Sequence, residues 1–290
     1  MPIECSYFSG EGNTVYDLFA LSAANSGPLE ERLEQVLSQL EPHEQAALRS
    51  FAKAVQERGR ISLNMRLVPL NGFLTSGSRW TVYEFAAQEA AVSGRPADEI
   101  VREKLGPYYG KRIAFDRCFE GGETFHYGNL NMGGLGCSKY GRFCVVLRGD
   151  FPHDAAGAAY VPGDSLQRYV SGEGTPVVDH ARLADEVAPH SHRGCLACLK
   201  HSTDVCHLAE DAWAGCLCSE DTFVEAIFME RPRREDVESV RVASAHYEQL
   251  ADLAFDDYAR DLPEAERAIV GHFGMILGCL REDNIRVEVL

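Results

Sequence analysis

One carboxylate stands alone in a strongly apolar run of the sequence. Glu225 lies within residues 222–229, where six apolar residues surround it. Such a run predicts a buried strand, in which an ionised side chain is costly unless something pairs with it. A buried carboxylate of this kind is a candidate for catalysis. The alternative is that alternation along a half-exposed strand turns Glu225 outward.

An arginine in an alternating segment is the second candidate. From Ile61 to Leu67, apolar residues alternate with polar ones, which predicts a strand with one polar face. Arg66 lies on that face together with Asn64. A fixed guanidinium could bind a pyrophosphate through two parallel hydrogen bonds. The competing interpretation is a solvated surface arginine.

The third candidate is a segment rich in cysteine and histidine. Cys195 and Cys198 have the spacing of metal ligands, whereas Cys216 and Cys218 are separated by one residue only. We therefore expect no metal site, and interpret these residues as reduced thiols in a helical insertion. A structural zinc knuckle stays open as the alternative. The residues concerned are His190, His192, Cys195, Cys198, His201, Cys206, His207, Cys216 and Cys218.

Charge and composition restrict the partners. With 28 Lys and Arg against 44 Asp and Glu, the chain of 290 residues carries a net charge of −16. A field of that sign repels phosphate backbones, which disfavours a nucleic-acid partner, and it suits a basic protein. No stretch approaches the roughly 18 to 20 apolar residues of a membrane span, so we expect no membrane partner. The N-terminus lacks the features of a cleavable signal peptide.

The elements that would hold these residues form a mixed pattern. Helical periodicity predicts two helices before residue 57, beginning near Gly27 and Pro42, and two more near Trp80 and over Pro96–Leu105. Residues 143–147 predict a strand, and the chain from 163 to the Glu225 strand is expected to be rich in loops. Two helices and a strand, Ile285–Leu290, are expected at the end. We predict an α+β fold rather than a doubly wound sheet.

Three segments together resemble the ADP-ribosyltransferase superfamily. They are, in order, a polar-faced strand at 62–66, a Tyr-Gly-Asn-Leu-Asn motif at 127–131, and a late strand at 223–226 with its single glutamate. The segments 140–144, 163–165 and 236–242 are similar to a bacterial domain family within which the CteC type of secreted effector is the nearest likeness. Those effectors attach ADP-ribose from NAD to a threonine of host ubiquitin. This chain departs from them in having Asn64 and Arg66 where histidines are usual.

The resemblance implies roles for particular residues. Glu225 would stabilise the cationic ribose as the bond to nicotinamide breaks, the step for which a fixed carboxylate is suited. The residues that would bind NAD are Asn64, Arg66, Arg79, Tyr83, Tyr127 and Asn131. Glu220 and Asp221 would meet the acceptor, and Glu220 is the second choice for the catalytic carboxylate.

The resemblance also implies an organisation and a function. The implied fold is a split β-sheet core at residues 58–243; the resemblance leaves the flanking segments unexplained, and helical periodicity predicts a helical N-terminal lobe at 1–57 and C-terminal helices with a final strand at 244–290. The implied activity is transfer of ADP-ribose from NAD to a protein, with ubiquitin threonine as acceptor. The protein would be secreted without a cleavable signal and act in host cytoplasm as a toxin; otherwise it would be cytoplasmic. The alternatives are an NAD glycohydrolase and a non-catalytic, metal-stabilised interaction module.

Overall fold

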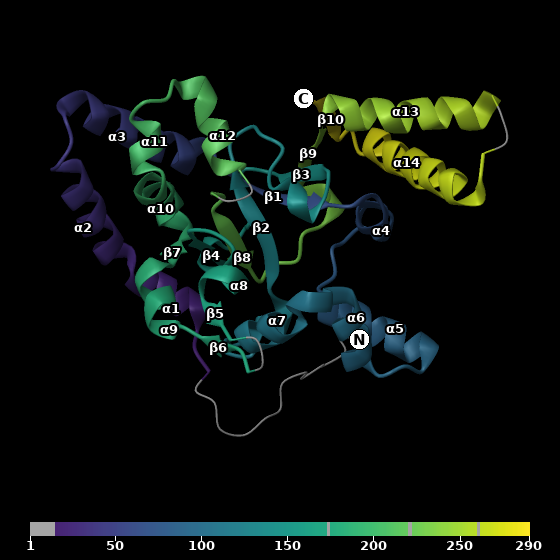
Figure 1. Ribbon diagram of the computed structural model, residues 1–290, viewed down its shortest axis with the longest axis horizontal. Helices are drawn as coiled ribbons and strands as arrows, with labels where there is room; N and C mark the ends of the chain where they lie inside the picture. Colours follow the sequence, from purple (N-terminus) through teal and green to yellow (C-terminus); the bar gives the residue numbers. More distant parts are fainter. Residues whose placement is uncertain (1–14, 173–174, 220–221, 260–261) are drawn as a thin grey trace.

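A large mixed sheet forms the centre of the molecule, and helices lie at both of its ends (Figure 1). The structure is a computed structural model that describes residues 15–172, 175–219, 222–259 and 262–290. The predicted α+β class is confirmed.

Eight strands are hydrogen-bonded in the order β10-β9-β3-β1-β2-β8-β4-β7. Their bounds are β1 Arg60–Met65, β2 His126–Asn131, β3 Phe143–Leu147, β4 Ala158–Val161, β7 Ala188–Pro189, β8 Glu225–Phe228, β9 Val237–Val242 and β10 Arg286–Val289. A separate pair contains β5 Val170–Ser171 and β6 Val177–Val178. The pairing is continuous through all eight strands, so the two-sheet division implied by the resemblance is not seen in the hydrogen bonding.

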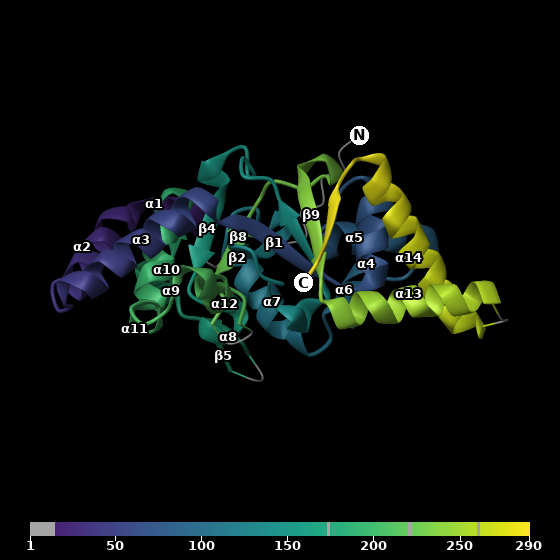
Figure 2. The same cartoon turned by 90° about the horizontal axis from the view of Figure 1, so that it is seen from above.

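Helices precede, interrupt and follow these strands. They are α1 Leu18–Ala24, α2 Ser26–Leu37, α3 Pro42–Arg58, α4 Leu67–Ser76, α5 Val82–Ser93, α6 Ala97–Leu105, α7 Tyr109–Asp116, α8 Ser165–Arg168, α9 His180–Glu186, α10 Arg193–Lys200, α11 Ser202–Val205, α12 Trp213–Leu217, α13 Ser244–Ala259 and α14 Glu264–Glu282. Seen from above, α2 and α3 lie at one end of the sheet and α13 and α14 at the other (Figure 2).

The two faces of the sheet differ in chemistry. One face carries apolar residues that pack into the largest hydrophobic cluster, which includes residues from α3, α4, α10 and α14. This cluster draws residues from all three predicted segments of the chain. The other face carries a buried row that is polar apart from one valine. It crosses β8, β2, β1, β3 and β9 through directly paired residues, which are Glu225, Asn129, Ser62, Val146 and Ser239. Directly paired residues share a face of a sheet.

Two local predictions are wrong. The strand does not continue to Leu67; it ends at Met65 and α4 begins instead, running through Asn71 and Gly72. Leu70, Phe73 and Leu74 are buried at helical spacing there, and this packing overrides the turn preference of Asn-Gly. The expected loop-rich stretch after residue 163 contains α8 to α12. These helices have four to eight residues each, which is too short for a clear periodic signal.

Candidate active site

Glu225 is the first residue of β8, in the interior of the sheet between β2 and β4. Its predicted burial is confirmed: the residue is 6% exposed, so the outward orientation is excluded. Its Oε2 accepts a hydrogen bond of 2.9 Å from the backbone N–H of Ser165. Burial raises the pKa of Glu225 to about 7, and the negative charge of Asp164 adds to the rise. Near neutral pH the carboxyl group can therefore hold or release a proton.

A buried carboxylate on α7 gathers three further side chains, and we call Asp116, Arg112, Tyr83 and Tyr127 the Asp116 cluster. The hydroxyls of Tyr83 and Tyr127 donate to Asp116 at 2.7 and 2.5 Å. Nε of Arg112 donates to the same carboxylate at 2.6 Å, and the guanidinium lies 3.4 Å from the centre of the Tyr127 ring. Asp116 itself is fully buried. The cluster holds two aromatic side chains and a cation in fixed positions.

The Asp116 cluster adjoins Glu225 along the sheet. Tyr127 precedes Asn129 by two residues on β2, and Asn129 is the residue paired with Glu225, so all three side chains are on one face. The positive charge of Arg112 opposes the rise in the pKa of Glu225. The pKa of Tyr127 is raised mainly by burial, and the negative charge of Glu225 adds to that rise. These are interactions between near neighbours.

Arg79 is a second cation beside the cluster. Its Nη1 donates to the backbone carbonyl of Tyr127 at 3.0 Å. Burial and the nearby charge of Arg112 lower the pKa of Arg79 to about 10. Among the described residues, no carboxylate forms an ion pair with Arg79. A desolvated guanidinium with a neutral acceptor as its partner favours the approach of an anion.

Two predicted residues have a structural role. Asn131 Oδ1 accepts from the backbone of Gly133 and Gly134 at 2.8 and 2.9 Å. Asn64 Nδ2 donates to the carbonyls of Leu135 and Gly141 at 2.9 and 3.0 Å. Their amides therefore hold residues 132–141 against the polar face of the sheet.

The remaining predicted residues are dispersed. Arg66 is exposed at the N-cap of α4 and is not part of the Asp116 cluster. Glu220 and Asp221 lie outside the described residues. Of the proposed NAD-binding residues, the structure thus brings Arg79, Tyr83 and Tyr127 together at the Asp116 cluster, of which Tyr127 shares the sheet face of Glu225.

Several residues of the site were not predicted from the sequence. Arg112 and Asp116 stand four residues apart on one face of α7, a spacing that suits an ion pair, and Asp116 directly follows the buried Phe115. That spacing is a usable but weak signal. Nothing local marks Ser165 as a donor to Glu225, because 60 residues separate the two.

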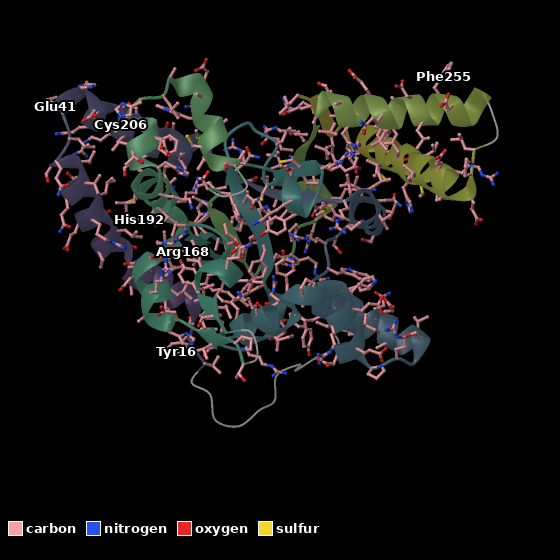
Figure 3. All side chains as sticks on the ribbon, viewed as in Figure 1. Tyr16, Glu41, Arg168, His192, Cys206 and Phe255 are labelled. Atoms are coloured by element: carbon pink, nitrogen blue, oxygen red, sulfur yellow. The ribbon has the colours of Figure 1, made fainter. Side chains whose placement is uncertain are left out.

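The cysteine- and histidine-rich segment is spread over several elements. The Sγ atoms of Cys195 and Cys198 donate to the carbonyls of Leu29 and Leu48, on α2 and α3. All cysteines in the described part of the chain are free thiols. His192 and Cys206 lie at separate places on the helical end of the molecule (Figure 3). Among the described residues, no group of three or more His, Cys, Asp or Glu side chains is placed to hold a metal ion.

Two surface grooves lie away from Glu225. One, of about 550 Å³, follows α2 and is lined by Glu30, Glu31 and Glu34. The other, of about 450 Å³, separates α2 from α3 and α10 and is lined in part by His192. Neither includes a residue of the Asp116 cluster.

No protein-family model and no curated protein sequence matches this chain. No helix in the described ranges is long and apolar enough to cross a membrane.

Proposed function

We propose that this protein transfers ADP-ribose from NAD to a protein acceptor, with Glu225 as the catalytic carboxylate. The observation that carries the proposal is a buried carboxylate, Glu225, on the same face of the sheet as Tyr127 of the Asp116 cluster, with Arg112 over the Tyr127 ring and Arg79 bonded to the Tyr127 backbone. The polar strand, the Tyr-Gly-Asn-Leu-Asn segment and the glutamate strand pair side by side in this sheet as β1, β2 and β8.

The position of Glu225 suits the bond-breaking step. When nicotinamide leaves NAD, positive charge develops on the ribose, and a fixed carboxylate in a water-poor site stabilises that charge. Glu225 is held by the backbone of Ser165 and shielded from solvent. The ionised carboxylate would stabilise the positive charge on the ribose, and the protonated carboxyl group would not.

Arg79 and Arg112 are the cations that would bind the pyrophosphate of NAD. The chain has a net charge of −16, so a dianionic pyrophosphate needs a local positive region. Arg112 is neutralised by Asp116, whereas Arg79 has no carboxylate partner within the described residues. We assign phosphate binding to Arg79, assisted by Arg112. Tyr83 and Tyr127, with both hydroxyls bonded to Asp116, would lie against the nicotinamide.

The proposed acceptor is a threonine of ubiquitin. The resemblance to the CteC type of effector supports a threonine of ubiquitin, a secreted route and action in host cytoplasm. The acidic surface of this chain favours a basic partner. In the reaction the hydroxyl oxygen forms a bond to the ribose carbon, nicotinamide leaves with the electron pair of the broken bond, and the hydroxyl proton is released.

The test is incubation of the purified protein with labelled NAD and ubiquitin. Labelled ubiquitin from the wild type, lost in Glu225→Gln and retained in Arg66→Gln, would support both the activity and the site. The absence of labelled product from the wild type, or full activity in Glu225→Gln, would overturn it. Release of nicotinamide with no protein labelled would identify an NAD glycohydrolase instead.

A further inference from the structure

Four side chains meet beside Glu225, and we call Lys139, Tyr140, Asp164 and Phe223 the Tyr140 gate. The hydroxyl of Tyr140 donates to Oδ2 of Asp164 at 2.7 Å, and Lys139 Nζ lies 3.4 Å from the same oxygen. The ring of Tyr140 stands edge-on to Phe223 with 6.2 Å between centres, and Lys139 Nζ lies 5.0 Å from the Phe223 ring centre.

The gate is joined to Glu225 by two short stretches of chain. Ser165, whose backbone N–H binds Glu225, directly follows Asp164. Phe223 precedes Glu225 by two residues, and Val224 between them belongs to the apolar cluster on the opposite face. The pairing with β2 continues before the start of β8, since Val224 O accepts from Leu130 N at 2.9 Å, and alternation along this extended chain turns Phe223 and Glu225 to the same side. The gate residues thus lie on the face from which a ligand must reach Glu225.

The side chain of Tyr140 has fewer polar contacts than the backbone beneath it. The backbone beneath it, residues 132–141, is fixed by the amides of Asn64 and Asn131. The Tyr140 side chain is fastened to Asp164 by one hydrogen bond, and Tyr140 is 40% exposed. Asp164 remains in place when this bond breaks, because its Oδ1 accepts from the backbone of Leu166 and Gln167 at the start of α8.

We propose that Tyr140 is a gate that closes the space at Glu225 to water and swings away from Asp164 to admit a ligand. Resting on the proposed function, the gate also sets how ADP-ribose divides between the protein acceptor and water. In both reactions the bond from ribose to nicotinamide breaks, nicotinamide keeps the electron pair, and the attacking oxygen releases one proton. The reactions differ only in whether a protein hydroxyl or a water molecule supplies that oxygen, so the exclusion of water favours transfer.

The first experiment needs no NAD. The full-length protein is treated with a water-soluble carbodiimide and an amine, and labelling of Glu225 is followed by peptide mass spectrometry relative to the exposed Glu235. Because a hydrogen bond to a charged group is lost, we expect the labelling rate of Glu225 to rise roughly tenfold in Tyr140→Ala and severalfold in Tyr140→Phe. Phe255→Ala is the matched control, since Phe255 is 72% exposed on α13 at the far end of the molecule (Figure 3). Thermal melts of each variant check that it is folded.

An unchanged Glu225 labelling rate in folded Tyr140→Ala would overturn the gate, whatever the protein does with NAD. If the wild type turns over NAD, the ratio of hydrolysis to transfer should rise roughly tenfold in Tyr140→Ala and stay constant in Phe255→Ala. A constant ratio in Tyr140→Ala would refute the division of products by the gate. A wild type inert toward NAD would refute the proposed function and the division together, while the labelling result still decides the gate itself.

Discussion

The cysteine- and histidine-rich segment and the region around Asp116 differ in how closely their side chains approach one another in sequence and in space. The first is conspicuous in the sequence, with nine Cys and His residues between 190 and 218. In space the thiols of Cys195 and Cys198 donate to α2 and α3 and that of Cys218 donates to Asn131 on β2, and no metal-binding group forms among the described residues. The second is inconspicuous in the sequence, with members on α5, α7 and β2. In space they share one buried carboxylate. Nearness in sequence is therefore a poor guide to nearness of reactive groups here.

The first prediction sets the stability of the two regions against each other. Asp116→Ala should lower the free energy of unfolding by about 3–5 kcal/mol, because it leaves the largely buried Arg112 cation unpaired. Cys198→Ala, in the other region, should cost about 1 kcal/mol. Urea denaturation measures both.

Asp98→Ala is the control for that prediction. It removes an exposed carboxylate from a pair with Arg102 at the same i,i+4 spacing and should cost at most about 0.5 kcal/mol. If Asp116→Ala behaved like Asp98→Ala, the cluster would not be the stabilising unit that we describe.

The second prediction concerns activity. Glu225→Gln should lower kcat for ADP-ribose transfer by about 10²–10³-fold, because an amide cannot stabilise the cationic ribose. Cys198→Ala should leave kcat within about twofold, since Cys198 bonds to α3 and not to the polar face of the sheet. Equal losses in the two variants would mean that the chemistry does not depend on the Asp116 region.

The third prediction separates two arginines. Arg79→Gln should raise KM for NAD by roughly tenfold, because it would remove the proposed charge-assisted contact to the phosphates. Arg66→Gln should leave KM unchanged, because Arg66 is exposed at the start of α4 and lies outside the cluster. Steady-state kinetics with varied NAD measure the difference. The opposite order of effects would favour the assignment to Arg66 that the resemblance implies.

The fourth prediction is a dependence on pH. With the pKa of Glu225 at about 7, the ionised fraction and hence kcat should rise about tenfold between pH 6 and 8. The folded-state pKa lies above the ordinary value of 4.5, so the folded state retains a proton that the unfolded state has lost between these values. This group therefore contributes most to stability below about pH 4.5, and that contribution is lost as pH rises through about 7.

Glu225→Gln supplies the control for the pH dependence. The contribution of Glu225 to the free energy of unfolding, which falls in the wild type as pH rises to about 7, should be absent from this variant. Urea titrations from pH 4 to 8 measure the difference. An identical pH profile in the wild type and the variant would place the pKa of Glu225 near its ordinary value.

The smallest effect is expected from metal removal. A chelator should change the melting temperature by no more than about 1 °C, because the thiols of this segment have separate acceptors: those of Cys195, Cys198 and Cys206 donate to helix carbonyls, and that of Cys218 donates to Asn131 Oδ1. Elemental analysis accompanies the melt. Stoichiometric zinc and a large drop in melting temperature would favour the metal-stabilised module and reverse our comparison of the two regions.

Local pattern predicted much of the fold and part of the site. Proline at the start of α3 and alternation in β1 are short-range signals: α3 begins at Pro42 as predicted, and β1 forms over the predicted strand as far as Met65. The burial of Glu225 followed from its apolar neighbours. The bond from Ser165 to Glu225 and the convergence of α5, α7 and β2 on Asp116 depend on tertiary packing, which no local pattern encodes. The short helices α8 to α12 escaped prediction for the same reason, since packing rather than periodicity stabilises them.

Intact-mass spectrometry of ubiquitin after incubation with NAD and the purified protein tests the central claim most directly. Our account predicts the mass of one added ADP-ribose with the wild type and unmodified ubiquitin with Glu225→Gln. Unmodified ubiquitin with the wild type would contradict the acceptor, and the same modification with Glu225→Gln would contradict the role of the buried carboxylate.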